Sequence, residues 1–130
     1  MSLFLGHRMV LEPAADARRW TLCCALHYRS DVQGRTVVVP KGFVTDGASV
    51  PRLFWNLIPP WGRYGQAAVV HDYLYATQTT TRRLADDTLL EAMRVSGCGV
   101  WSYAVIYLAV RMFGWMAWRA DRARKTNVEL

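Results

Sequence analysis

The feature that most constrains the fold is an apolar segment, Ala67–Tyr75, which carries the adjacent residues His71 and Asp72. Alanine, valine and leucine surround the pair, and this composition predicts a buried helix. A histidine and a carboxylate can be buried only if hydrogen-bonding partners compensate for the hydration that they lose. The fold is therefore expected to bring such partners from other parts of the chain.

Three helices are predicted in the second half of the chain. The first spans about Tyr64–Thr77 and contains the His-Asp pair, the second spans about Arg82–Val95, and the third spans about Val100–Arg122. The polar turn Thr79–Thr81 can cap the second helix at its start, and Ser96–Gly97 is typical of a helix end.

The first 45 residues are predicted to form β structure. The strand candidates, rich in valine, leucine, threonine and aromatic residues, are His7–Glu12, Arg19–Tyr28 and Arg35–Val44, with Ser30–Gly34 as a hairpin loop. The expected fold class is α+β, with a small N-terminal antiparallel β-sheet followed by a helical bundle whose antiparallel helix pair carries the site. We expect a single domain over 1–130, β-rich over 1–45 and helical over 46–130.

The segment that joins these parts is predicted to begin as a loop. Glycines, prolines and a Thr-Asp-Gly triplet within Pro40–Pro51 favour exposed backbone carbonyls there. A short helix over Arg52–Ile58, with Ser49 as its N-cap, is expected to end at Pro59.

Helical periodicity gives the two aspartates of the second helix different surroundings. At about 100° per residue, four apolar residues form one stripe: Ala85, Leu89, Ala92 and Met93. Asp86 falls inside this stripe, whereas Asp87, Glu91 and Arg94 fall on the opposite side, which we expect to be solvated.

The spacing also predicts a partner for His71. The turn between the first two helices is short, so they should pack antiparallel. His71 and Asp86 then lie at the same height, each about 8–9 Å from the turn, on axes about 8–10 Å apart. A carboxylate that accepts a hydrogen bond from one ring nitrogen fixes the tautomer and leaves the other nitrogen as a base near neutral pH.

Two further interpretations concern metals and structure. Asp72, together with Asp46 and loop carbonyls, could bind Ca²⁺, which would polarise an ester carbonyl. A zinc site is disfavoured, because the three histidines lack ligand spacing and the three cysteines form no C-x-x-C motif. The alternative is that His71 and Asp86 form a satisfied polar core with no chemical role.

The third helix is unusually apolar. Trp101–Trp118 contains Arg111 as its only charge, and four basic residues follow at Arg119, Arg122, Arg124 and Lys125. A core helix, an interfacial or partner-docking helix and a membrane span are all compatible with this pattern. Nucleic acid is a disfavoured partner, because it would rest on the net charge of +6 alone.

Two resemblances bear on function. The residues of Val39–Arg52, His71–Tyr75, Ala85–Asp86 and Val110–Gly114 resemble a phage and prophage family catalogued as domain of unknown function 1353. That resemblance covers nearly the whole chain and implies a bacteriophage or prophage source.

The second resemblance is shorter. His71-Asp72-x-x-Tyr75 followed by Ala85-Asp86-x-x-Leu89 is similar to phospholipase A2, above all to its parvoviral and other disulfide-poor members. It implies calcium-dependent hydrolysis of lipid esters, with His71 as general base, Tyr75 and Asp86 orienting it, and Asp72 binding calcium.

The alternative function is that of a non-catalytic virion protein, tail-associated, or of an accessory interaction protein with a structural His-Asp cluster. The expected partners are a phospholipid or membrane surface, bound through the C-terminal aromatic and basic helix, or other phage proteins. The N-terminus lacks the features of a signal peptide. The expected location is the phage virion or the host cytoplasm, with or without membrane association.

Overall fold

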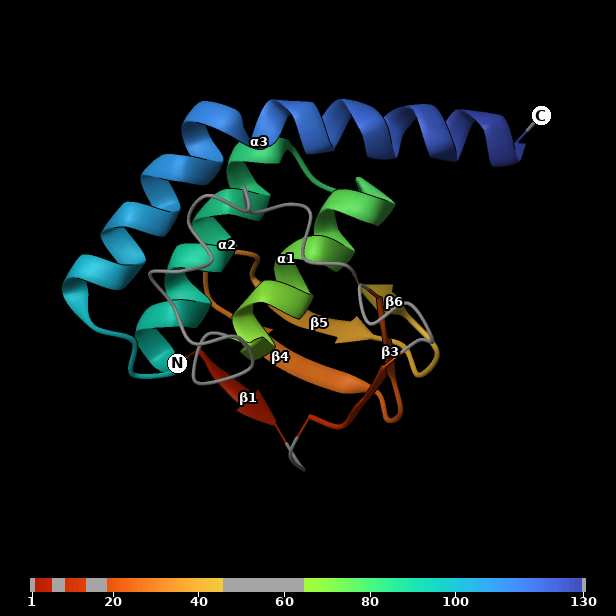
Figure 1. Ribbon diagram of the computed structural model, residues 1–130. Coiled ribbons are helices and arrows are strands. Elements are labelled where there is room, and N and C mark those ends of the chain that lie inside the picture. The colour runs from red at the N-terminus through yellow and green to blue at the C-terminus, as the bar shows by residue number, and fades with distance from the viewer. Residues whose placement is uncertain (1, 6–8, 14–18, 46–64, 130) are drawn as a thin grey trace.

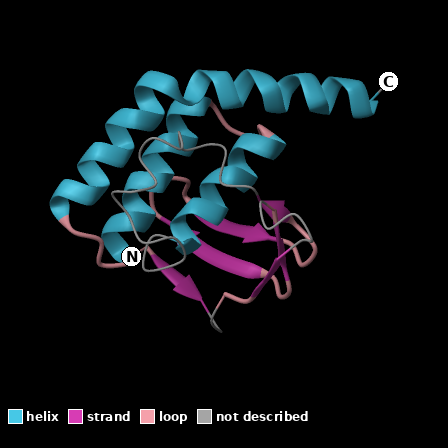
Figure 2. Ribbon diagram, in the orientation of Figure 1, coloured by secondary structure: helices cyan, strands magenta, loops and turns pink. Residues whose placement is uncertain are grey.

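The computed structural model describes residues 2–5, 9–13, 19–45 and 65–129, with side chains of the last helix described up to residue 124. Strands occupy the first part of the chain and helices the second, so the expected α+β class is confirmed (Figures 1 and 2). The elements in order are β1 (Leu3–Leu5), β2 (Leu11–Pro13), β3 (Trp20–Leu22), β4 (Leu26–Ser30), β5 (Arg35–Val39), β6 (Val44–Thr45), α1 (Gly65–Thr77), α2 (Arg82–Val95) and α3 (Val100–Glu129).

The described strands form two antiparallel sheets and not the single sheet that was predicted. One sheet has the order β1-β4-β5 and the other β2-β3-β6. The predicted strand Arg19–Tyr28 is wrong as one element, because the chain bends at Cys23 and Cys24 and passes there from one sheet to the other. The backbone N–H of Cys23 donates to the carbonyl of Val10, outside the strand ladder, at 2.8 Å.

The other strand predictions also need correction. Of the strand predicted at His7–Glu12, residues 7 and 8 lie outside the described residues, residues 9 and 10 are not in a strand, and β2 begins at Leu11; β1 was not predicted. The strand predicted at Arg35–Val44 is interrupted after Val39, because Pro40 has no N–H for the ladder and Gly42 has a φ of 90°. The expected hairpin loop is confirmed between β4 and β5, where Ser30 pairs with Arg35.

The described helices agree closely with prediction. α2 has the predicted bounds, its N-cap Thr81 accepts from the backbone N–H of Leu84, and Gly97 after its end has a φ of 82°. α3 continues beyond the predicted Arg122 to Glu129, because alanine, arginine and lysine sustain a helix in the absence of proline or glycine. The short helix predicted at Arg52–Ile58 lies outside the described residues, as does its N-cap Ser49.

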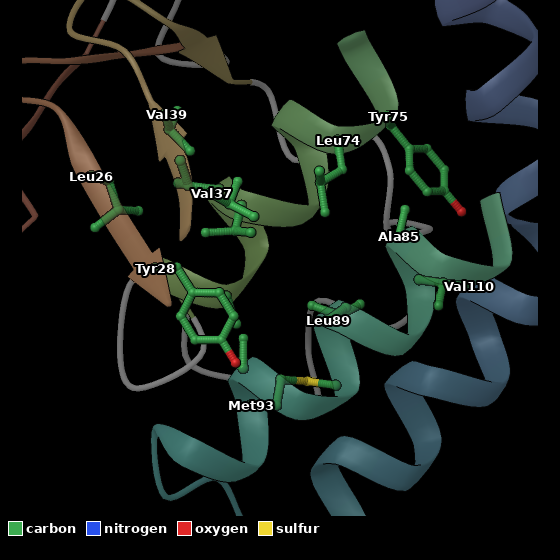
Figure 3. Packing of buried hydrophobic residues seen from close by; sticks show 14 of the residues in the cluster. Leu26, Tyr28, Val37, Val39, Leu74, Tyr75, Ala85, Leu89, Met93 and Val110 are labelled. Atoms are coloured by element: carbon green, nitrogen blue, oxygen red, sulfur yellow. The ribbon is translucent and has the colours of Figure 1, made fainter. Parts of the chain in front are cut away.

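The core lies between the β1-β4-β5 sheet and the helices. α1 contacts β5 and β6 as well as α2 and α3, which explains why nine of its thirteen residues are buried. Figure 3 shows the buried side chains of β4 and β5 facing those of α1 and α2. The predicted stripe of α2 is confirmed as core, since its four residues are fully buried.

A polar contact ties α2 to the β4–β5 hairpin. Glu91 was expected to be solvated, but its carboxylate accepts hydrogen bonds from the hydroxyls of Tyr28 and Ser30 and from the backbone N–H of Val32. Burial alone would raise the pKa of Glu91, yet these hydrogen bonds outweigh burial and lower the pKa below the usual range. Helical phase places a residue relative to its own helix only, so it could not reveal a strand on that side.

Candidate active site

The predicted contact between the first two helices is present. α1 and α2 pack against each other, and the Nε2 atom of His71 lies 2.7 Å from the Oδ1 atom of Asp86. Both side chains have an exposed fraction of 0%. The sequence spacing that placed the two residues at one height was therefore correct, and the catalytic role of the pair stays a prediction.

Tyr75 completes this contact from the next turn of α1. Its hydroxyl donates to the same Oδ1 atom of Asp86 at 2.6 Å, and its ring centroid lies 4.3 Å from that of His71. Burial raises the pKa of Tyr75 well above the usual range for tyrosine, and the neighbouring carboxylate of Asp86 raises it further. Tyr75 therefore remains a hydrogen-bond donor to Asp86 across the physiological pH range.

Two arginines hold the other oxygen of Asp86. The Nη1 atom of Arg111, on α3, lies 2.8 Å from Oδ2, and the Nη1 atom of Arg82 lies 3.4 Å from it. Arg82 also donates to the backbone carbonyls of Val110 and Arg111. The carboxylate thus receives donors from three helices, and we call His71, Tyr75, Arg82, Asp86 and Arg111 the Asp86 cluster.

Arg82 and Arg111 were not predicted as site residues, although the sequence contains a signal for each. Arg82 precedes Asp86 by four residues, which puts the two on one face of α2. Arg111 is the only charge in Trp101–Trp118, and an isolated cation in so apolar a helix needs a partner inside the fold. Both arginines keep part of their side chains exposed, whereas Asp86 is fully buried.

The predicted metal ligands are only partly within the described structure. Asp72 is buried, and its Oδ2 atom accepts a hydrogen bond from the hydroxyl of Thr45 at the end of β6. Asp46, the next residue in the chain, lies outside the described residues. Within the described ranges, no three histidine, cysteine, aspartate or glutamate side chains form a group that could hold a metal. Calcium also takes backbone carbonyl oxygens as ligands, so calcium binding at Asp72 and Asp46 stays a prediction.

Gly114 of α3 allows the close approach of Tyr75. A Cβ atom at this position would lie 2.5 Å from the Tyr75 hydroxyl oxygen and 3.2 Å from the Nη1 atom of Arg82. The Tyr75 hydroxyl cannot move away without losing its hydrogen bond to Asp86. Glycine is therefore required here to let α3 pack against the cluster.

We expect Gly114→Ala to destabilise the chain. Overpacking costs about 1–3 kcal/mol, and the better helix propensity of alanine offsets up to about 1 kcal/mol of it. The 2.5 Å contact places the overpacking cost in the upper part of this range, so urea denaturation should show a net loss of at least about 1 kcal/mol. Gly99→Ala is the matched control, because a Cβ atom there meets nothing within 4 Å. An equal effect of both substitutions would contradict the proposed close approach.

The fold and the cluster define an α+β protein in which one buried carboxylate joins three helices. The chain belongs to the family described as protein of unknown function DUF1353, whose profile matches residues 20–110. The predicted family is thereby confirmed. The match includes four members of the Asp86 cluster and ends one residue before Arg111.

The chain is also similar to a curated bacterial protein. It is 36% identical over 86 residues to "Uncharacterized protein y4jT" of Sinorhizobium fredii (strain NBRC 101917 / NGR234). The similar region covers 65% of this chain, and the chain spans about a quarter (26%) of the length of that relative. No solved structure matches the chain.

Proposed function

We propose that this chain is a bacteriophage or prophage protein with phospholipase A2-like activity, a hydrolase that cleaves acyl esters of phospholipid. The observation that carries the proposal is the 2.7 Å contact between His71 Nε2 and Asp86 Oδ1. A buried carboxylate in that position fixes the histidine tautomer and directs the proton-accepting function to the other ring nitrogen, Nδ1. The spacing of His71, Tyr75 and Asp86 in the sequence, which is similar to that of phospholipase A2, supports the same reaction class.

In the proposed reaction, Nδ1 of His71 accepts a proton from a water molecule while the water oxygen adds to the acyl carbonyl carbon. The resulting tetrahedral species then expels the glycerol oxygen, which takes the proton from Nδ1. The C–O ester bond breaks, giving a fatty acid and a lysophospholipid. Asp86 stabilises the transient imidazolium, and Tyr75 and Arg111 hold Asp86 in place.

Calcium is part of the proposal, with Asp72 and Asp46 as ligands. A bound calcium ion would supply a positive charge that polarises the ester carbonyl. The roles of His71, Tyr75 and Asp86 given above do not depend on it.

A second candidate is favoured by a different observation. His71 and Asp86 are fully buried, and the Asp86 cluster joins α1, α2 and α3. The same residues would thus serve a non-catalytic virion protein, tail-associated, or an accessory interaction protein in which the cluster only stabilises the fold.

Hydrolysis of phospholipid vesicles separates the two candidates. The purified full chain is incubated with phosphatidylglycerol vesicles in calcium or in excess chelator, and released fatty acid is measured by mass spectrometry. We expect release in calcium and loss of release with chelator. Release that persists with chelator would remove calcium from the proposal, and the absence of release in calcium would overturn the hydrolase in favour of the structural candidate.

A further inference from the structure

α3 has two different faces. Its inner face packs on α1 and α2 through Ile106, Ala109, Val110 and Gly114, all of which are buried. Large apolar side chains are exposed along the outer face, with Trp101 at 85% and Met112 at 62% exposure. The stripe on this face, which we call the outer stripe, consists of Trp101, Leu108, Met112, Trp115 and Met116.

The outer stripe extends along much of the helix. At about 100° per residue its members lie on the side opposite Val110. Over Val100–Arg124, α3 is long and apolar enough to cross a membrane, judged by length and composition only. Only 22% of its most apolar stretch is buried inside the fold. Arg111 and Gly114 nevertheless fix α3 to the other helices, so the exposed face lies on the surface of a folded body. In Figure 1 the first half of α3 lies beside α2, and its second half turns and extends past α1.

Positive charge adjoins the outer stripe at its C-terminal end. Arg119, Arg122 and Arg124 are exposed, and Asp121, the only acidic residue of α3 whose side chain is described, forms an ion pair with Arg124, which leaves Arg119 and Arg122 as the excess positive charge. The guanidinium of Arg119 lies over the ring of Trp115, 5.1 Å from its centroid, at the boundary between the apolar and basic parts.

This charge disfavours a second copy of the chain as the occupant of the stripe. Parallel pairing of two α3 helices would bring the arginines together. Antiparallel pairing would place them against the N-terminal end of the other helix, which has positive dipole character and no acidic residue in its first turn. A surface complementary to the outer stripe and its arginines would have negative charge on its exterior and apolar groups below that charge.

We infer that the outer face of α3 binds the surface of an anionic phospholipid bilayer through the outer stripe and the arginines that follow it. Leucine, methionine and tryptophan side chains of the stripe enter the boundary between headgroups and acyl chains. The arginines remain at the level of the phosphates, where each contributes electrostatic attraction. The inference rests on α3 alone and does not require that the chain hydrolyses lipid.

The test measures binding to vesicles of ether-linked lipids, which contain no acyl ester, so its outcome is independent of any hydrolysis. The purified full chain is cosedimented with vesicles made of equal parts of phosphatidylglycerol and phosphatidylcholine, or of phosphatidylcholine alone. We expect binding at least about tenfold tighter to the anionic vesicles and weaker binding as salt is raised. Equal affinity for both vesicles, or no binding to either, would overturn the inference.

Two sets of variants locate the binding surface. Leu108→Ser with Met112→Ser should lower the affinity for anionic vesicles by about tenfold or more, and Arg119→Gln with Arg122→Gln by about tenfold. Val38→Thr is the control, because Val38 is an exposed apolar residue of β5 and threonine keeps its branched shape. Circular dichroism verifies that each variant is folded, and the arginine pair tests the inference if the apolar pair does not fold.

The same variants distinguish the bilayer from a protein partner. Unchanged vesicle binding in both sets would contradict the inference. A dimer in sedimentation equilibrium that the Leu108→Ser and Met112→Ser pair converts to a monomer would also overturn it, because the stripe would then be an interface between two copies of this chain.

Discussion

Replacement of Asp86 by alanine is expected to lower the free energy of unfolding by about 3–5 kcal/mol, the range for removal of one partner from a buried ion pair. The substitution removes the acceptor of His71, Tyr75 and Arg111 together, and the side chains of His71 and Tyr75 are buried. Arg82 would lose its contact with Asp86 but keep its hydrogen bond to the carbonyl of Val110. Urea denaturation of the full chain measures the effect.

The neighbouring aspartate provides a matched control. Asp87 keeps 34% of its side chain exposed, accepts a hydrogen bond from Tyr107 and lies 4.0 Å from Arg83. Asp87→Ala should cost about 1 kcal/mol or less. Asp86→Asn, which keeps one acceptor oxygen, should fall between the two. If Asp86→Ala and Asp87→Ala were equally destabilising, the Asp86 cluster would not hold the three helices together.

Replacement of His71 by glutamine is expected to lower kcat for phospholipid hydrolysis by about 10²–10⁴-fold, the usual contribution of a general base. The glutamine amide nitrogen can still donate to Asp86, but the side chain cannot accept a proton from water. Most of the hydrogen-bonding pattern is therefore kept while the proposed chemistry is lost. Initial rates of fatty-acid release, compared between the variant and the original chain, measure the effect.

His27→Gln is the control for this experiment, because His27 is exposed on β4 and should leave the rate unchanged. A His71→Gln variant with the original rate would show that His71 is not the base. The structural candidate predicts a different pair of results. It predicts no hydrolysis by the original chain, and a loss of a few kcal/mol of stability in His71→Ala, as for a buried polar partner left unsatisfied.

The contact between His71 and Asp86 could be predicted because it depends on regular geometry. Both residues lie on helices joined by a short turn, so the rise per residue fixes their heights and the angle per residue places Asp86 among apolar neighbours. The bounds of α2 were predicted for a related reason, since Thr81 and Gly97 are local signals at its two ends.

Features that depend on how separate elements pack together could not be predicted from the sequence. Whether Arg111 meets Asp86 depends on how α3 crosses α2, and no spacing along the chain encodes that crossing. The requirement for glycine at position 114 follows from the position of Tyr75 on another helix. The division into two sheets depends on a bend at Cys23 and Cys24 that carries neither glycine nor proline, the usual signals of a turn. Asp46 and the segment 46–64 lie outside the described residues, so the metal hypothesis remains a prediction.

The shared carboxylate has a consequence for how this family diverges. A change at Asp86 leaves His71, Tyr75 and Arg111 without their acceptor, and a side chain at position 114 displaces Tyr75. Single substitutions in this set therefore carry a cost that only further substitutions in the same set can relieve. Descendant sequences should accordingly keep the whole set or lose all of it together, whereas exposed positions outside this set and outside the outer stripe, such as Val38, can change one at a time.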